Sequence, residues 1–463
     1  MAKYKAYSEY RDSGVEWLGE IPVHWKTISI ARLFSRNKRT GYTEKELLSV
    51  YRDYGVIPKS SRDDNNNKPS EDLSPYQLVE PDDLVMNKMK AWQGSIAISE
   101  YEGIVSPAYF VYQPQKILFE NAHPRYVHYL LRNPIYITQY LSRSKGIRIN
   151  QWDLDPDEFR NIELLLPSKI EQRKIFSFLD HETTKIDNLI EKQQQFIDLL
   201  KEKRQAVISH AVTKGLNPDV PMKDSGVEWL GTVPLSWTIS KFAYIKEVLT
   251  DYTANGSFAD LKANVNYKDE ISFARLVRLT DLRKNLENID GVWIDEKAYN
   301  YLNKSSLFGG EFLLANVGAY AGLFYQMPYN KGFASLAPNM FMAKFNKSKV
   351  SPEFMSIIGQ SHYIYEQLKL KATASSAQPK INKDDFKSII FSYPSLHEQK
   401  KIVTIIETKI STIDGIVKTG NKLLELLKER RTALISAAVT GKIDVRHWRA
   451  PNEQTTDEAE AAQ

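Results

Sequence analysis

The chain of 463 residues contains no cysteine. Without a thiol it can form no disulfide, no thiolate metal site and no cysteine nucleophile. No apolar run approaches the roughly 18 residues that a membrane-spanning helix requires. The first residues, MAKYKAYSEYRDSG, lack the apolar core of a secretory signal. These absences are compatible with a cytoplasmic protein.

Signatures of several enzyme classes are missing as well. The sequence has neither the G-x-x-x-x-G-K-[S/T] loop that cradles nucleotide phosphates nor the dinucleotide-binding G-x-G-x-x-G. Amino-methylating enzymes carry an Asn/Asp-Pro-Pro-aromatic loop, and the nearest segment, 106–109, lacks its first residue type and its second proline. His123 and His128 have no third metal ligand in view, and the acidic residues of 384–387 flank the apolar Phe386. We therefore expect no catalytic centre and no metal site in this chain.

The composition indicates a folded protein with more than one domain. Charged residues make up 26% of the chain and aromatic residues 11%. The length leaves room for roughly two to four domains. The net charge of +5, from 62 basic and 57 acidic residues, permits nucleic-acid binding without requiring it. Charge alone therefore does not decide the class of partner.

Two stretches, 167–215 and 394–441, predict long helices. Each starts with a Ser-x-x-Glu capping box, at Ser168 and Ser395, and ends at a glycine. Apolar residues recur every 11 positions in both stretches. This repeat is about 3.67 residues per turn, so the apolar stripe stays on one side of a straight helix, and the first helix would be roughly 70 Å long. The expected pairing seam consists of Ile175, Phe178, Ile186, Leu189, Ile197, Leu200, Ile208, Ile402, Ile405, Ile413, Ile416, Leu424, Leu427 and Ile435.

A second duplicated motif precedes each variable region. Residues 12–25 and 224–237 are identical at ten of fourteen positions, in the pattern D-S-G-V-E-W-L-G-x-x-P-x-x-W. Because large apolar residues stand on a turn-rich segment, we expect each box to anchor the chain by packing. The expected anchors are Trp17, Leu18, Pro22, Trp25, Trp229, Leu230, Pro234 and Trp237.

Each variable region combines short strands with a helix that a proline opens. In the first region we expect a helix from Pro124 that reaches Tyr140, and in the second a helix from Pro352. Phe159 and Phe386 align just before the two long helices and should lie in the cores of their domains. The expected strands are 84–86, 95–99, 109–112, 312–315, 323–325 and 340–345.

The chain thus repeats one plan twice, as an internal pseudo-two-fold duplication. We predict an α+β fold in which two mixed α/β domains are separated by a pair of long antiparallel helices, a coiled-coil spacer. The expected boundaries are a repeat box at 1–26, a variable domain at 27–165, a central helix at 166–215, a second box at 216–238, a second variable domain at 239–393, a distal helix at 394–445 and a disordered acidic tail at 446–463.

With these motifs in this order, the whole chain apart from its tail resembles the specificity subunits of type I restriction–modification systems. The resemblance rests on the paired boxes, on the P-S-x-x-E-Q-x-K-I helix starts at 167–175 and 394–402, and on the closing A-V-T-K-G and A-V-T-G. It implies a cytoplasmic prokaryotic protein. It also implies that two target-recognition domains each read one half of an asymmetric, bipartite site in double-stranded DNA.

The resemblance further implies partners and cofactors. Two modification subunits would bind S-adenosylmethionine and methylate adenine at N6, and two restriction subunits would use ATP and Mg²⁺ for translocation and cleavage. The specificity subunit itself would bind no cofactor and have no catalytic centre. Two alternatives remain open. One is a coiled-coil adaptor whose two divergent heads bind proteins, and the other is a self-contained enzyme with an unrecognised site.

Polar residues in the divergent loops are the candidates for reading bases. Arg and Lys suit guanine and Asn and Gln suit adenine, while Lys and Arg on phosphates position a protein without specifying sequence. In the first domain the candidates follow a strand and a helix, and in the second they occupy the corresponding loops. They are Lys88, Lys90, Trp92, Gln93, Arg143, Lys145, Arg148, Asn150, Gln151, Asn316, Tyr320, Lys369, Lys371, Gln378, Lys380 and Asn382.

Overall fold

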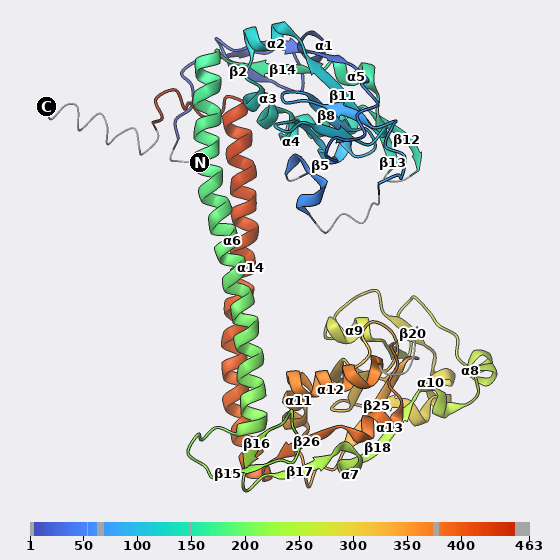
Figure 1. Cartoon of the computed structure of the whole chain (residues 1–463). Helices are drawn as coiled ribbons and strands as arrows, with labels where there is room; N and C mark the ends of the chain where they lie inside the picture. The colour runs from blue at the N-terminus through green and yellow to red at the C-terminus, as the bar shows by residue number, and fades with distance from the viewer. Residues whose placement is uncertain (1–3, 53, 63–68, 149–150, 374–378, 450–463) are drawn as a thin grey trace, which may run out of the picture. The chain divides into compact units, whose positions relative to one another are not determined.

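The computed structural model describes residues 4–52, 54–62, 69–148, 151–373 and 379–449. The chain forms two compact units (Figure 1), Met1–Gln194 with Lys422–Gln463, and Gln195–Asn421. They are called unit 1 and unit 2 below, and each is described by itself. Each unit holds one variable head and a part of both long helices. Within the described residues, no helix combines the length and the apolarity that crossing a bilayer requires.

The two long helices are α6 (Lys169–Lys214), of 46 residues, and α14 (Leu396–Val439), of 44 residues. The serine half of each predicted capping box is formed, because the hydroxyl of Ser168 accepts the backbone N–H of Glu171 at 3.3 Å and that of Ser395 accepts the N–H of Glu398 at 3.4 Å. Beyond each end stands a glycine in the left-handed region, with φ of +77° at residue 215 and +73° at residue 441. Local capping chemistry therefore sets both ends of both helices.

The two helices pair in antiparallel fashion within each unit. In unit 1 the guanidinium of Arg431 binds both carboxylate oxygens of Asp187, at 2.7 and 3.1 Å. In unit 2 Arg204 Nε binds Asp414 Oδ1 at 2.9 Å. In both pairs a residue from one part of α6 meets one from the opposite part of α14, which requires antiparallel chains. These exposed pairs set the register more than they add stability, since surface ion pairs contribute little.

The seam between the helices is narrower than the sequence pattern suggests. Leu189, Ile405 and Ile416 are 52%, 41% and 42% exposed, which corrects their expected place on the seam. They belong to the second apolar stripe, and two paired helices cover only a narrow strip of each other's surface. Leu200, Leu427 and Ile435 are half-buried. The buried seam positions are Ile175, Phe178, Ile186, Ile197, Ile208, Ile402, Ile413 and Leu424.

The head of unit 1 is a mixed α/β domain made mostly of short strands. Its elements in chain order, with the repeat box, are β1 (Tyr10–Asp12), β2 (Glu20–Pro22), β3 (Lys26–Ser29), α1 (Ile30–Leu33), β4 (Phe34–Arg36), β5 (Leu48–Tyr51), β6 (Gly55–Pro58), η1 (Lys59–Ser61), β7 (Gln77–Val79), β8 (Leu84–Asn87), η2 (Ala91–Gln93), β9 (Ile96–Ile98), β10 (Gly103–Val105), β11 (Tyr109–Pro114), α2 (Lys116–Asn121), α3 (Pro124–Leu131), α4 (Pro134–Ser142), β12 (Ser144–Arg148), β13 (Gln151–Leu154), α5 (Pro156–Arg160) and β14 (Glu163–Leu166). The main sheet is antiparallel with the order β4-β11-β8-β9. The β3–β14 pair joins the strand that enters the head to the strand that leaves it for α6.

The head of unit 2 repeats this frame. Its elements are β15 (Met222–Asp224), β16 (Thr232–Pro234), β17 (Thr238–Lys241), α7 (Phe242–Ile245), β18 (Lys246–Asp251), η3 (Tyr252–Asn255), α8 (Phe258–Asn264), β19 (Ala274–Val277), α9 (Leu279–Arg283), β20 (Val292–Ile294), α10 (Glu296–Tyr301), η4 (Asn303–Ser305), β21 (Ser306–Leu307), β22 (Phe312–Ala315), β23 (Phe324–Gln326), β24 (Ala334–Leu336), β25 (Met340–Phe345), α11 (Pro352–Gln360), α12 (His362–Thr373), α13 (Lys383–Ser388) and β26 (Ile390–Tyr393). The sheet β18-β25-β22-β23 corresponds to β4-β11-β8-β9, and β17–β26 corresponds to β3–β14. A second sheet, β20-β19-β24-β21, has mixed strand directions.

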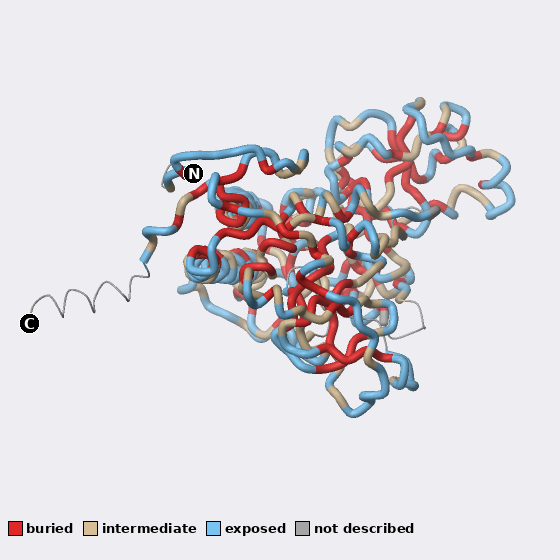
Figure 2. The backbone as a smooth tube through the Cα atoms, turned by 90° about the horizontal axis from the view of Figure 1, so that it is seen from above, coloured by how far each residue is buried: buried red, intermediate tan, exposed pale blue. Residues whose placement is uncertain are grey.

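Both heads have apolar interiors, and the buried stretches run through them in Figure 2. Phe159 and Phe386 are fully buried, which confirms their predicted place in the cores. The helix expected from Pro124 to Tyr140 is two helices, α3 and α4. Pro134 opens the second helix and the side chain of Asn133 caps it, accepting the N–H of Ile135 at 2.9 Å. An interior proline cannot donate the backbone hydrogen bond that a continuous helix needs.

The three duplicated motifs meet at one point in each unit. The indole N–H of Trp25 donates to the capping-box carboxylate of Glu171 at 3.1 Å, and that of Trp237 donates to Glu398 at 3.0 Å. The terminal glycine of the other long helix lies against each indole. A Cβ at Gly441 would stand 2.5 Å from Pro22 and 3.4 Å from Trp25, so no larger residue fits there. Box, helix start and helix end are therefore one packed joint.

The next residue along each helix ties the joint to the head. Gln172 accepts the N–H of His123 at 2.8 Å, and Gln399 accepts the N–H of Ser351 at 2.8 Å. Both amides also donate to the backbone carbonyl of the proline five residues earlier, at 2.8 and 2.9 Å. Each glutamine is fully buried. The two units thus share their polar contacts as well as their strand order.

The joint of unit 1 has two additional donors. Besides Trp25, Glu171 binds the hydroxyl of Tyr7 at 2.6 Å and His24 Nε2 at 2.8 Å, and it is only 4% exposed. We predict that Glu171→Gln lowers the free energy of unfolding by about 1–3 kcal/mol. The amide would put an N–H donor where the carboxylate now accepts hydrogen bonds from three side chains. The matched change Glu398→Gln, where a single side chain donates in the described structure, should cost about 1 kcal/mol or less. Urea unfolding of both variants measures this, and equal losses would contradict it.

The seam gives a second prediction. Inserting 11 residues into both α6 and α14 adds one full repeat and should leave the thermal unfolding temperature within a few degrees of the parent. Inserting two residues turns the following apolar stripe by about 200° and should destabilise the chain strongly. Circular dichroism melts compare the two insertions. If the two-residue insertion melts like the parent, the seam is not what holds the helices together.

Candidate nucleic-acid interface

In the first head the structure brings two candidate clusters together. The segment 88–93 follows β8, and the β12–β13 hairpin folds against it. Lys88 Nζ lies 3.2 Å from Asp153 Oδ2, and the rings of Trp92 and Trp152 are 4.9 Å apart between centroids. The backbone N–H of Leu154 also donates to the carbonyl of Lys88 at 3.3 Å. A two-stranded ribbon of this kind has the width that the major groove of DNA admits.

The candidate side chains of this cluster have different surroundings. Lys90, Gln93 and Lys145 are exposed. Arg143 is half-buried, donates to the carbonyl of Gln139 at 3.3 Å and lies 4.0 Å from Glu158, so it holds the end of α4. Three more candidates follow in the sequence. The backbones of Arg148 and Gln151 pair across β12 and β13, and Asn150 lies outside the described residues.

In the second head the loop after β22 meets the segment before α13. The N–H of Gly318 donates to the carbonyl of Pro379 at 2.9 Å, and that of Ile381 donates to the carbonyl of Asn316 at 2.8 Å. The strand β22 occupies the place of β8 in the sheet order. Both heads therefore have candidate residues just after equivalent strands. The segment 316–322 is a turn with Gly318 and Gly322 at positive φ.

The side chains of this second cluster are also of several kinds. Tyr320 is 51% exposed and Lys380 is exposed. The Oδ1 atom of Asn382 accepts the N–H groups of Asp384 and Asp385, at 2.8 Å each, so this oxygen caps α13. Asn316 Oδ1 is buried without a hydrogen-bond partner among the described residues. Lys369 and Lys371 are exposed on α12, and Gln378 lies outside the described residues.

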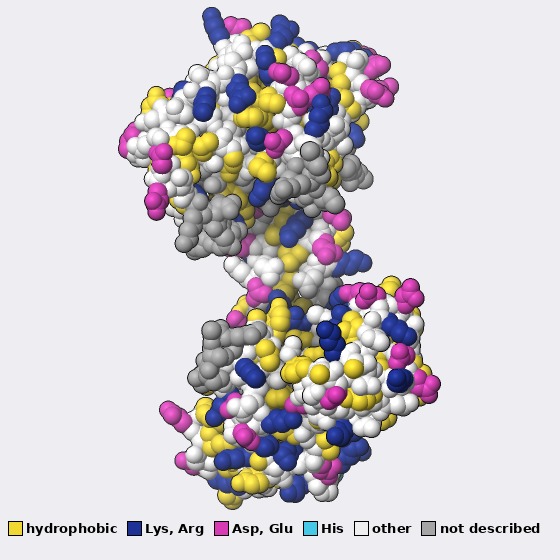
Figure 3. Space-filling view, turned by 90° about the vertical axis from the view of Figure 1, so that its right-hand side faces the viewer, with side chains coloured by type: hydrophobic (Ala, Val, Ile, Leu, Met, Phe, Trp, Pro, Cys, Tyr) yellow, Lys and Arg dark blue, Asp and Glu magenta, His cyan; other side chains and the backbone are white. Residues whose placement is uncertain are grey.

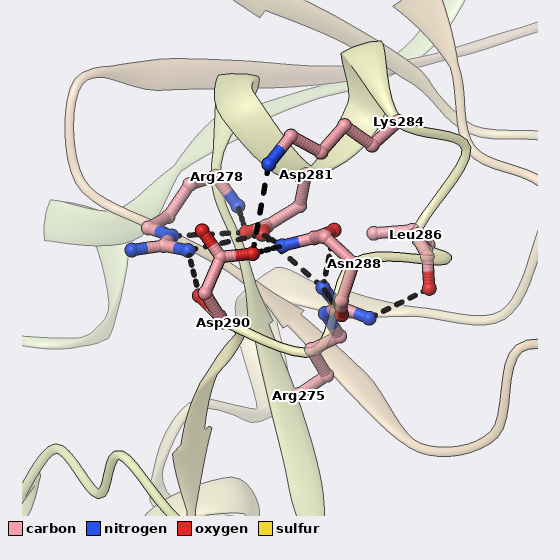
Figure 4. A network of polar contacts seen from close by, with 7 residues as sticks. All are labelled: Arg275, Arg278, Asp281, Lys284, Leu286, Asn288 and Asp290. Carbon is pink, nitrogen blue, oxygen red and sulfur yellow. Dashed lines mark hydrogen bonds and ion pairs between the residues drawn. The ribbon is translucent and has the colours of Figure 1, made fainter. Parts of the chain in front are cut away.

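A buried ionic network supports this side of the second head (Figure 4). Asp281 is fully buried in α9 and accepts hydrogen bonds from Arg275 at 3.2 Å, from Arg278 Nε at 3.0 Å and from Asn288 at 2.8 Å. Burial alone would raise the pKa of Asp281, but the hydrogen bonds from Arg278 and Asn288 outweigh it and lower the pKa to about 2. The network fixes the start of α9 and the loop that follows it.

Sequence reasoning missed Trp152 and the network. Trp152 stands in the hairpin between Gln151 and Asp153, and its role depends on a partner far away in the chain. For the network the available signal was the spacing of Arg278 and Asp281, three residues apart at a helix start. On the faces that Figure 3 shows, Lys and Arg side chains are mixed with Asp and Glu in each unit. The candidate interface is therefore defined by its loops and not by one basic patch.

Known proteins resemble the chain over nearly its whole length. Residues 283–426 match the family described as "Type I restriction modification DNA specificity domain". The StySPI specificity subunit of Salmonella potsdam, a type I restriction enzyme subunit, is 23% identical over 451 residues, which cover 94% of this chain and 92% of the relative. The EcoKI specificity subunit of Escherichia coli K12 is 20% identical over 455 residues, with the same coverage.

By these matches the chain resembles the specificity subunits of type I restriction–modification systems. These are the non-catalytic, DNA-binding subunits of such enzymes, and methylation and cleavage take place in partner subunits. The fold agrees. A solved chain from a study of complex assembly and conformational transition in the type I R-M system has a TM-score of 0.66 to this one, at 13% identity, covering 90% of this chain and 98% of that one. The part of this chain that matches the family model includes the loop 316–322 and the segment before α13.

The network generates a prediction for the second head. Asp281→Asn leaves Arg275, whose side chain is 7% exposed, without its carboxylate, and should lower the free energy of unfolding by about 3–5 kcal/mol. The carboxylate of Asp281 has a depressed pKa in the folded state, so its contribution is present above about pH 4 and is lost as the pH falls toward 2. The stability of Asp281→Asn should therefore fall less than that of the parent as the pH is lowered from about 4 to 2.

Asp290→Asn is the matched control, because this side chain is 73% exposed at the rim of the same network. It should leave both the stability and its acid dependence unchanged. Denaturant unfolding from pH 2 to pH 7 measures all three proteins. Equal effects of the two substitutions would show that the buried charge of Asp281 does not hold the head together.

Proposed function

We propose that the chain reads an asymmetric, bipartite sequence in double-stranded DNA, one half with each head. The observation that carries this proposal is the common position of the two divergent clusters. In both heads they follow the equivalent strand, β8 or β22, of an equivalent four-stranded sheet. The frame is shared, while the presented elements differ, a β-hairpin in one head and a turn beside α12 in the other. Different elements on one frame are what reading two different half-sites requires.

The chemistry of the clusters suits this role. Exposed Lys90, Lys145 and Lys380 provide charge for phosphates or guanine, and Gln93 provides an amide for adenine. Each half-site would be recognised by its own head, and the paired helices would fix the number of unread base pairs between the half-sites. A dimeric reader uses its symmetry axis in the same way to set half-site spacing.

The proposal includes the partner subunits. Two modification subunits would use S-adenosylmethionine to methylate adenine at N6, and two restriction subunits would use ATP and Mg²⁺. This chain would bind none of these cofactors and would supply the target sequence for all of them. The adaptor alternative differs in one measurable respect. A protein that neutralises phosphates loses DNA affinity steeply as salt rises, and an adaptor would show no such DNA affinity.

A genome-wide map of N6-methyladenine tests the proposal. Cells that contain the modification subunit, with and without this chain, should differ by one gapped motif with two unlike halves. Replacing residues 239–393 by the variable domain of another specificity subunit should change one half of the motif and leave the other half intact. The repeat boxes and long helices stay unchanged in this exchange and serve as its internal control. A methylation pattern that is independent of the chain would reject the proposal.

A further inference from the structure

One arginine of the second head stacks on a tyrosine of the candidate turn. Arg283 is the last residue of α9, and its guanidinium carbon lies 3.9 Å from the ring centroid of Tyr320. Both side chains are exposed, Tyr320 to 51%. Arg283 was not among the residues that the sequence singled out. The stack brings it to the same turn that carries Asn316 and Tyr320.

The charge of Arg283 is not neutralised by an acid. The neighbouring Arg275 and Arg278 both bind Asp281, at 3.2 and 3.0 Å. Arg283, in contrast, forms no ion pair with any described residue. Hydrogen bonds with the hydroxyls of Tyr320 and Tyr325 raise the pKa of Arg283 and engage part of its guanidinium. A guanidinium carries five N–H donors, so the groups that do not face the tyrosines stay available to other acceptors. The side chain is thus oriented by two tyrosines, and its remaining donors are available.

Both supports of the stack are fixed to the head. α9 starts at the buried Asp281 network, only two residues before Arg283 (Figure 4). The turn that carries Tyr320 is closed by the N–H of Leu323, which donates to the carbonyl of Tyr320 at 3.1 Å, and by the contact of Gly318 with Pro379. An arginine held in this way loses little conformational freedom when it binds a ligand.

We propose that Arg283 reads a guanine of the second half-site, with its guanidinium fork on the O6 and N7 atoms of the base in the major groove. Arg to guanine is the commonest base-specific contact, because the planar fork matches these two acceptors. Tyr320 is the positioning residue that orients the fork. This inference rests on the proposed function and adds a residue and a base to it. It requires the half-site read by the second head to contain at least one G·C pair.

The test uses the complete modification complex. The methylation map is recorded for the parent, Arg283→Ala and Arg283→Gln, with the second half-site assigned beforehand by exchanging the variable domain. We expect both variants to lose the requirement for one guanine of that half-site and to keep the first half-site. Arg36→Ala is the matched control, because Arg36 stacks on Phe110 in the first head at the same 3.9 Å. It should leave the second half-site unchanged.

Binding by the purified complex separates the remaining outcomes. On the parent site, Arg283→Ala should weaken binding about 5- to 150-fold, and on a site whose critical G·C pair is replaced it should have almost no effect. Tyr320→Ala should show the same dependence on that base pair with a smaller loss, and Tyr320→Phe, which keeps the ring but not the hydroxyl, should lose less than Tyr320→Ala. A uniform loss on all sequences, with the salt dependence reduced by about one charge, would indicate a phosphate contact and overturn the proposal.

Two further results would also be decisive. A second half-site without a G·C pair, or an unchanged motif in Arg283→Ala, would overturn the guanine contact while leaving the bipartite reading intact. A parent complex that produces no gapped motif would instead reject the proposed function itself. The two failures are therefore distinguishable in the same data.

Discussion

A hydrogen bond from a buried indole to a capping carboxylate, formed once in each unit, is the contact on which the architecture depends. Trp25 and Trp237 reach the first turn of a long helix, and the glycine that ends the other helix packs on the same indole. A helix start, a helix end and the entrance of a head are thereby fixed together. A head joined to its helix by the covalent chain alone would swing freely, and its loops could not keep a fixed place relative to the helix pair.

This joint explains why the two halves of the chain agree where they do. The duplicated motifs are the residues that form the joint, and the buried glutamines behind it, Gln172 and Gln399, repeat the same backbone contacts. Between these fixed points the heads are free to differ as long as their first and last strands still pair. The β3–β14 and β17–β26 pairs meet that condition. Structural duties are thus concentrated at the ends of each head, and the loops in its middle are free to differ.

Sequence patterns predicted the parts of this structure that depend on local chemistry. The long helices, their caps and the strands at β8, β11, β22 and β25 follow from periodicity and from turn residues. The width of the seam was predicted wrongly at Leu189, because it depends on how much of the helix its partner covers. The convergence of 88–93 with the hairpin, and the burial of Asp281, depend on pairings across the fold that one sequence does not reveal.

The two heads also differ in how they hold their loops, and this difference bears on function. The first head uses an aromatic contact, Trp92 on Trp152, whose burial is favourable by itself. The second buries Arg275 with Asp281, and removing two charges from water costs about as much as their attraction returns. Such a network adds little net stability, but it fixes the directions of its hydrogen bonds. Its presence beneath α9 is therefore better explained by the need to orient what α9 carries than by the stability of the head.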